Sequence, residues 1–112
     1  MLKNALRSAA DGKPRLFFLG QAGFAVKSGE GKILVIDPYL TDCVRPLEGN
    51  DGFKRLIPAP IAPEEVEADV IVATHPHYDH FDVDAMPVLT EKGAFLYASV
   101  ARCALLLASS AV

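Results

Sequence analysis

All three histidines of the chain lie between positions 75 and 80, in the motif His-x-His-x-Asp-His formed by His75, His77, Asp79 and His80. Imidazole and carboxylate groups are ligands that Zn²⁺, iron and Mn²⁺ accept. The motif directly follows the apolar run at positions 70–73, so we expect it at the end of a β-strand. A chance cluster of surface histidines is the alternative, but ligand-type residues alternating with other residues favour a metal site.

The spacing of the motif suggests how two ions could share it. In an extended segment, residues i and i+2 project to the same side, so His75 and His77 could hold one ion together. Pro76 favours this arrangement because the residue before a proline is kept out of the helical region. Asp79 and His80 are adjacent and diverge, which suits a second ion about 3.5–4 Å from the first. A water between two such ions loses a proton readily and can attack a carbonyl or phosphoryl centre.

A further aspartate ends another predicted strand. Asp37 and Pro38 stop the apolar run at positions 33–36, much as His75 follows the run at 70–73. If the two strands are neighbours, Asp37 could accept a hydrogen bond from a ligand imidazole or a backbone amide. An Asp-Pro turn that merely ends the strand is an equally good interpretation. Asp82 and Asp84 are better interpreted as helix caps than as ligands.

The rest of the sequence predicts an α+β pattern. Strands are expected at 16–19, 24–27, 33–36, 70–74 and 94–98, where short apolar runs are bounded by turn-forming residues. Helices are expected at 2–9, 85–92 and 100–112, with a helical turn at 64–67. Gly93 would cap the helix at 85–92. The proline-rich stretch 38–63 is long for a plain connector, and such loops are often functional.

Composition and charge limit the type of protein. A chain of 112 residues is one domain at most, and 51% hydrophobic with 22% charged residues is a globular composition. The net charge of −3 argues against nucleic acid or an anionic membrane surface as a partner. The sequence has neither a signal-peptide pattern nor an apolar run of about 18 residues, and the lone thiols Cys43 and Cys103 fit a reducing compartment. A cytoplasmic protein is therefore expected.

Few basic residues lie near the expected site. They are Arg45, Lys54 and Arg55, all within the proline-rich stretch. A solvated loop is the simpler interpretation of these charges. They remain candidates for holding an anionic substrate.

These motifs together resemble the metallo-β-lactamase superfamily, over residues 16–107. The segment 19–24 is similar to that family's first hairpin, Ile36-Asp37-Pro38 to its strand-end aspartate, and 74–80 to its His-x-His-x-Asp-His signature. Residues 72–84 are most similar to the branch that contains L-ascorbate-6-phosphate lactonase. The resemblance implies a cytoplasmic hydrolase that depends on one or two Zn²⁺ or Mn²⁺ ions, with an αββα sandwich fold.

By position, the resemblance also implies residue roles. His75 and His77 would bind the first metal, and Asp79 and His80 the second; Asp79 would be the catalytic residue that orients the attacking water, and Asp37 would support the ligands. The family supplies further histidine and aspartate ligands from later in its sequence, whereas no histidine follows His80 here. The expected fold is therefore α+β, the N-terminal half of an αββα sandwich, with one mixed sheet, helices on one face, and a single partial domain over 1–112.

Two functions of different classes remain open. The first is a lactonase-like metal-dependent hydrolase of a small, phosphorylated or lactone substrate, with little turnover expected from these 112 residues alone. The second is a non-catalytic half-domain that binds at most one metal weakly. Because half a sandwich leaves an apolar sheet face in water, the chain is expected in either case to form a homo-oligomer through that face, to be held by partner chains, or to aggregate.

Overall fold

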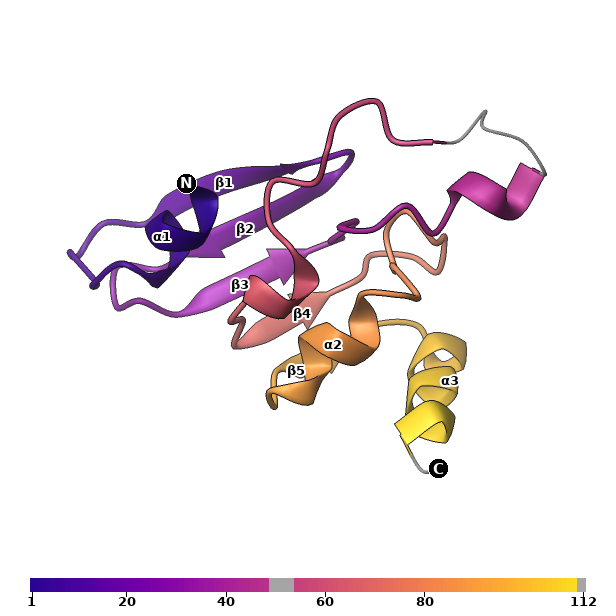
Figure 1. Cartoon of the computed structure of the whole chain (residues 1–112). Coiled ribbons are helices and arrows are strands. Elements are labelled where there is room, and N and C mark those ends of the chain that lie inside the picture. Colours follow the sequence, from indigo (N-terminus) through magenta and orange to yellow (C-terminus); the bar gives the residue numbers. More distant parts are fainter. Residues whose placement is uncertain (49–53, 111–112) are drawn as a thin grey trace.

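The computed structural model describes residues 1–48 and 54–110, and in them five strands form one mixed sheet (Figure 1). The strands lie in the order β1 (Arg15–Gly20), β2 (Gly23–Lys27), β3 (Ile33–Ile36), β4 (Val70–Val72) and β5 (Phe95–Tyr97). The first three are antiparallel neighbours, and β3, β4 and β5 run parallel. The helices are α1 (Leu2–Arg7), α2 (Met86–Glu91) and α3 (Val100–Ser110), with 3-10 turns η1 (Arg45–Glu48) and η3 (Pro63–Glu65).

The hydrophobic core lies between one face of this sheet and the helices α1, η3 and α2 (Figure 1). Alternate strand residues point into it, because successive side chains of a strand face opposite sides of the sheet. The buried residues of that face include Leu19, Ala25, Val35 and Ile71. They pack against Leu6, Val66, Met86 and Leu89 from the covering segments. This is the predicted α+β fold, with one mixed sheet and helices on one face.

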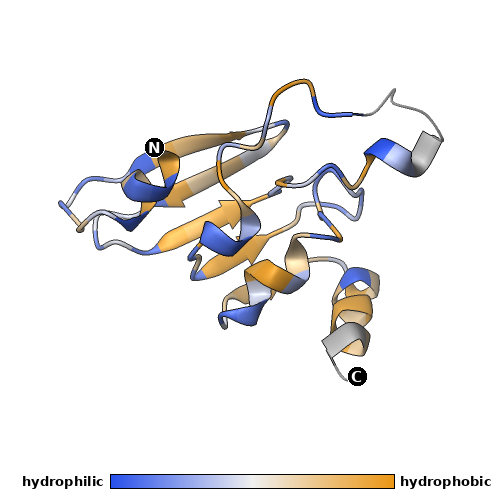
Figure 2. Ribbon diagram, viewed as in Figure 1, coloured by the Kyte–Doolittle hydropathy of each residue, from blue (hydrophilic) through white to orange (hydrophobic). Residues whose placement is uncertain are grey.

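The opposite face of the sheet is apolar and largely uncovered, and we call it the open face. The strand register aligns its side chains in two rows that cross all five strands. One row is Leu16, Val26, Leu34, Val70 and Phe95, and the other is Phe18, Phe24, Ile36, Val72 and Tyr97. Figure 2 shows the strands as predominantly hydrophobic. Leu16, Phe18, Phe95 and Tyr97 are each more than half exposed.

Some elements are shorter than the sequence predicted. β4 ends at Val72 and not at Thr74, because the amide of Thr74 donates to the carboxylate of Asp37 (2.7 Å) and not to a neighbouring strand. β5 ends at Tyr97, although Ala98 was included in the prediction. α1 ends at Arg7, where the buried ammonium group of Lys27 binds the carbonyls of Ala5 and Ser8. Such a bond satisfies carbonyls that a helix end leaves unpaired.

The two later helices form where they were predicted. α2 ends before Gly93, whose φ of +91° and bond from its amide to the carbonyl of Thr90 (3.0 Å) confirm it as the cap. α3 begins at Val100, and the last two residues of the predicted helix, 111–112, lie outside the described residues. Positions 49–53 of the proline-rich stretch also lie outside them. No helix in the described part of the chain is long and apolar enough to cross a membrane.

Candidate metal centre

Two parallel strands bring the candidate residues to one edge of the sheet. Ile36 at the end of β3 pairs with Val72 at the end of β4, so the residues that follow both strands meet. Asp37 follows β3, and the loop with the histidine motif follows β4. The amide of Asp37 donates to the carbonyl of Val72 (2.7 Å), which continues the ladder up to the site.

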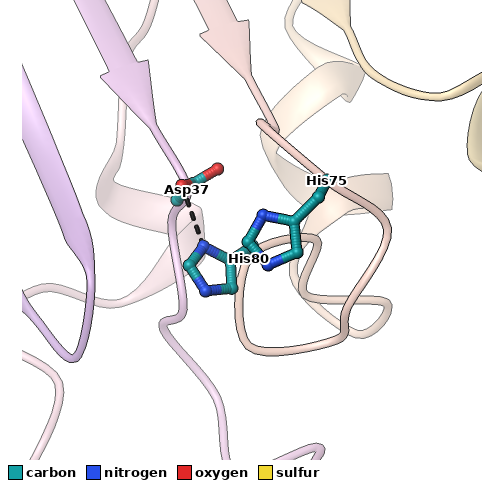
Figure 3. A group of neighbouring side chains, drawn as sticks. All are labelled: Asp37, His75 and His80. Atoms are coloured by element: carbon teal, nitrogen blue, oxygen red, sulfur yellow. Dashed lines mark hydrogen bonds and ion pairs between the residues drawn. The ribbon is translucent and has the colours of Figure 1, made fainter.

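Asp37 is the hydrogen-bonding centre of this edge. Its Oδ1 accepts from the amide of Thr74 (2.7 Å), and its Oδ2 accepts from the hydroxyl of Thr74 (2.7 Å). Oδ2 also accepts from Nδ1 of His80 at 2.8 Å, as Figure 3 shows. The bonds expected from an imidazole and from a backbone amide are therefore both present. Burial alone would raise the pKa of the Asp37 carboxyl, but these bonds outweigh it and hold that pKa below its ordinary value.

The backbone of Asp37 is unusual for a non-glycine residue. Its φ is +49°, in the left-handed region that side chains other than Asn, Asp and His rarely adopt. The hairpin between β1 and β2 passes closely behind it, because a Cβ at Gly23 would lie only 2.7 Å from the carbonyl oxygen of Asp37. Glycine is therefore needed at position 23 for the hairpin to reach the site.

The hydrogen bonds define which ring nitrogens are available. The carboxylate of Asp37 accepts the proton of His80 Nδ1, which leaves the lone pair of His80 on Nε2. The single hydroxyl proton of Thr74 goes to Asp37, so Thr74 Oγ1 accepts from Nδ1 of His75 at 3.0 Å. Both histidines thus present Nε2 for a ligand, with tautomers assigned from the hydrogen-bond network.

Three side chains in the described residues form a group that can hold a metal. Asp37, His75 and His80 each offer a ligand atom, and these atoms lie within 4.8 Å of one another. The rings of His75 and His80 lie against each other, with centroids 3.8 Å apart (Figure 3). Nitrogen and carboxylate donors of this kind fit Zn²⁺ or Mn²⁺.

His77 and Asp79 lie beside this group. The ring of His77 stands edge-on to that of His75, with centroids 4.8 Å apart. A carboxylate oxygen of Asp79 lies 3.7 Å from Nε2 of His80 and 3.4 Å from the side-chain amide of Gln21. The structure therefore brings all four motif residues into one loop, with His75 and His80 in the three-membered group and the other two at its margin.

The backbone bends at residues 74–77 and is therefore not the extended segment that the His75–His77 spacing suggested, and a turn follows it. The amides of His80 and Phe81 both donate to the carbonyl of His77, at 2.9 and 2.7 Å. This turn folds His80 back onto His75. Consequently it is His80, and not His77, that shares the group of three with His75 in this conformation.

Asp82 has a larger role than the helix cap that the sequence suggested. Its fully buried carboxylate does accept from the amides of Asp84 and Ala85, just before α2. It also accepts from the amides of Leu40 and Thr41 at 2.9 Å each. It therefore joins the segment after β3 to the end of the histidine loop. No local pattern indicates this, because the partners are 41 and 42 positions away.

Two other residues that the sequence did not single out hold the loop from outside. Gln21, in the turn between β1 and β2 with a φ of +51°, donates to Asp79. Arg102 of α3 donates from Nε to the carbonyl of Pro76 (3.0 Å), and its guanidinium lies 4.5 Å from the ring centroid of Tyr78. The first hairpin and the last helix thus both contact the motif.

The chain belongs to the beta-lactamase superfamily domain family, whose model matches residues 15–102. This confirms the superfamily that the motifs resembled. The chain is 34% identical over 97 residues to a UPF0173 metal-dependent hydrolase of Polynucleobacter asymbioticus, covering 85% of this chain and 30% of that protein. It is 42% identical over 81 residues to a UPF0173 metal-dependent hydrolase of Thermococcus kodakarensis, covering 72% and 29% respectively. The chain thus spans less than a third of the length of these curated relatives.

Proposed function

We propose that this chain forms part of a hydrolase that depends on a divalent metal. The observation that carries the proposal is the convergence of Asp37, His75 and His80 at the ends of two parallel strands, in a chain of this family. Its relatives in Polynucleobacter and Thermococcus are named as metal-dependent hydrolases, which supports the same chemistry here.

The proposed metal ligands are His75, His77, Asp79 and His80, with Asp37 fixing the orientation of His80. Zn²⁺ and Mn²⁺ are the proposed ions, one or two per site, because the donors are imidazole nitrogens and carboxylate oxygens. His77 reaches the group only after its side chain rotates from its edge-on position. A divalent ion supplies Lewis-acid chemistry, polarising a carbonyl or phosphoryl group and acidifying water.

Asp79 is the proposed catalytic residue. Its side chain is 33% exposed and lines a cavity of about 510 Å³. Gln21 donates to the same carboxylate oxygen that lies nearest to His80, which orients the group. A partly exposed carboxylate held in this way can accept a proton from an attacking water and orient that water toward the substrate.

The proposed substrate is a small molecule, and the reaction is proposed to be lactonase-like, on a lactone or phosphorylated compound. The cavity beside Asp79 has the size of typical small-molecule sites, which span roughly 300–1,000 Å³. With a net charge of −3, we propose neither nucleic acid nor membrane as a partner. A cytoplasmic location is also proposed, because the free thiols Cys43 and Cys103 fit a reducing compartment.

We also propose that the open face pairs with a second copy of this chain. Four of its residues are 58–71% exposed and Phe24 is 36% exposed. Taking about 200 Å² for an aromatic side chain, these fractions amount to roughly 600 Å² of apolar surface. This is near the upper end for a monomer and approaches the ~800 Å² per partner of a standard interface.

A non-catalytic half-domain that binds one ion weakly is the alternative. It is favoured by the size of the donor group, since the described residues bring only three ligand side chains within reach of one ion. Two measurements distinguish the hydrolase from the half-domain. One is the metal content after dialysis, and the other is the hydrolysis of p-nitrophenyl phosphate and of a γ-lactone. The hydrolase proposal expects metal retention that His80→Ala removes, and a low turnover that depends on the metal. A chain that retains metal but turns over neither substrate, or that retains no metal after dialysis, would support the half-domain and contradict the hydrolase proposal.

A further inference from the structure

The cavity beside Asp79 has two positively charged residues in its wall. It is lined by Gln21 and Asp79 at the candidate centre, by apolar side chains such as Phe18 and Ile57, and by Lys54 and Arg55. We propose that Lys54 and Arg55 bind an anionic oxygen group of the substrate, a phosphate or a carboxylate. This inference rests on the proposed hydrolase function, and it identifies the class of molecule that the site takes.

Arg55 is held in a fixed position by neutral groups. Its Nη1 donates to the carbonyl of Tyr39 (2.6 Å), and its Nε to the carbonyl of Ile57 (3.1 Å). The guanidinium carbon lies 4.8 Å from the centroid of the Tyr39 ring. These contacts place the cation without neutralising it, because carbonyls and the ring carry no net charge.

The second amino group of Arg55 lies at the first hairpin. A Cβ at Gly20, whose φ is +86°, would be 3.2 Å from Nη2. The absence of a side chain at position 20 therefore leaves room for the guanidinium next to the turn that carries Gln21. In this way the same hairpin borders both the cation and Asp79.

Lys54 and Arg55 have no acidic partner among residues 1–48 and 54–110, whereas several other basic residues do. Lys3, Arg7 and Arg15 each form an ion pair with a carboxylate. The side chain of Asp42 lies near Arg55, but it accepts from the backbone amide of Arg55 (3.0 Å) and lies 3.7 Å from the guanidinium of Arg45. Among the described residues that line the cavity, two cations stand against the single carboxylate of Asp79, so the wall has a net positive charge, which favours anion binding.

The position of the charges fits a particular kind of substrate. Asp79 and Arg55 line the same cavity, so a small molecule in it can contact the candidate centre at one end and the cations at the other. A guanidinium and an ammonium group both form charge-assisted hydrogen bonds with phosphate and carboxylate oxygens. A substrate whose anionic group lies a short distance from its scissile bond can bind the cations through that group while the scissile bond lies at the candidate centre.

The test is the titration of the full chain with inorganic phosphate and, in a parallel series, with acetate, by calorimetry, in metal-free and Mn²⁺-loaded protein. Lys54→Glu is the main variant, since Lys54 is exposed and its substitution leaves the core unchanged. We expect it to weaken binding about tenfold or more, while Lys54→Arg stays near the wild type. Lys13→Glu is the matched control, because Lys13 is an exposed lysine that precedes β1 and does not line the cavity.

Arg55→Gln is the second variant, with its fold checked by circular dichroism. We expect it to weaken phosphate binding at least as much as Lys54→Glu. If Lys54→Glu binds phosphate and acetate as Lys13→Glu does, the inference is wrong. Binding of phosphate but not acetate would assign the subsite to phosphate, and equal Lys54-dependent binding would assign it to oxyanions in general.

Metal retention in the same samples separates this inference from the function on which it rests. Retained metal with phosphate binding that does not depend on Lys54 would overturn the anion subsite and leave the hydrolase proposal intact. Lost metal with Lys54-dependent phosphate binding would overturn the hydrolase proposal and leave the anion subsite.

Discussion

The carboxylate of Asp37 lies 2.8 Å from Nδ1 of His80, although 43 positions separate the two residues. The same carboxylate binds the amide and hydroxyl of Thr74, and that hydroxyl contacts His75. One buried aspartate thus fixes the ring nitrogens of two histidines. The orientations of the two histidine rings are therefore set by hydrogen bonds within the protein before any ion is bound.

Asp37→Asn should weaken Zn²⁺ and Mn²⁺ binding about 10–100-fold, as is typical when the partner of a ligand histidine is lost. The amide cannot accept at both positions, so the tautomers of His75 and His80 are no longer fixed. Competition with a chromophoric chelator measures the affinity. Asp84→Asn removes an equal charge from an exposed side chain and should have little effect; equal losses in both variants would contradict a specific role for Asp37.

Alanine substitutions in the motif should show how much each proposed ligand contributes to metal retention. His75→Ala and His80→Ala should each remove most of the bound metal, because both belong to the group of three. His77→Ala should match them only if the His77 ring turns toward the ion from its present edge-on contact with His75. Elemental analysis after dialysis gives the metal content per chain. Full retention in His75→Ala or His80→Ala would show that the ion binds elsewhere.

Asp82→Asn should lower the free energy of unfolding by about 3 kcal/mol. The carboxylate is fully buried and accepts from amides on both sides of the site, and an amide group at this position would face some of those donors with a donor of its own. Urea unfolding followed by circular dichroism measures the change. The exposed Asp84→Asn variant should stay within about 0.5 kcal/mol of the wild type. A similarly small change for Asp82→Asn would mean that water replaces its contacts.

Cys43 should react slowly with iodoacetamide at neutral pH. Burial raises the pKa of its thiol to about 11, so the reactive thiolate is scarce at pH 8. In a Cys103→Ser variant, the measured alkylation is that of Cys43 alone. Its rate should be about 100-fold slower than that of a small free thiol. The rate should rise with pH from 8 to 10, because the thiolate fraction grows toward the pKa. Urea should restore ordinary reactivity, and a rate that levels off below pH 9 would contradict the raised pKa.

The open face should drive self-association at micromolar concentration. Phe18 and Tyr97 lie in the same cross-strand row and are more than half exposed, so placing charge on both should disfavour pairing. Sedimentation velocity should therefore show a larger species for the wild type and a monomer for Phe18→Lys/Tyr97→Lys. The exposed helix residue Leu107, replaced by lysine, is the control. A monomeric wild type would contradict pairing through this face.

Much of the architecture could be predicted from local sequence. The strands at positions 16–19, 24–27 and 33–36 form where predicted because short apolar runs between turn residues favour strands whatever their partners. Gly93 ends α2 as predicted because a left-handed cap needs only its own residue type. The identity of the candidate ligands also came from sequence, because only histidine and acidic side chains in that motif offer suitable donors.

The tertiary structure decided which of these residues meet. Asp37 reaches His80 because β3 and β4 are parallel neighbours, and Asp82 reaches Leu40 across 42 positions. The turn that places His80, and not His77, in the group of three with His75 occurs together with the bond between His80 and Asp37, which comes from a distant strand end. Sequence periodicity reports each residue's local conformation and burial. Hydrogen bonds between distant segments depend on strand order and loop path, which only the folded chain defines.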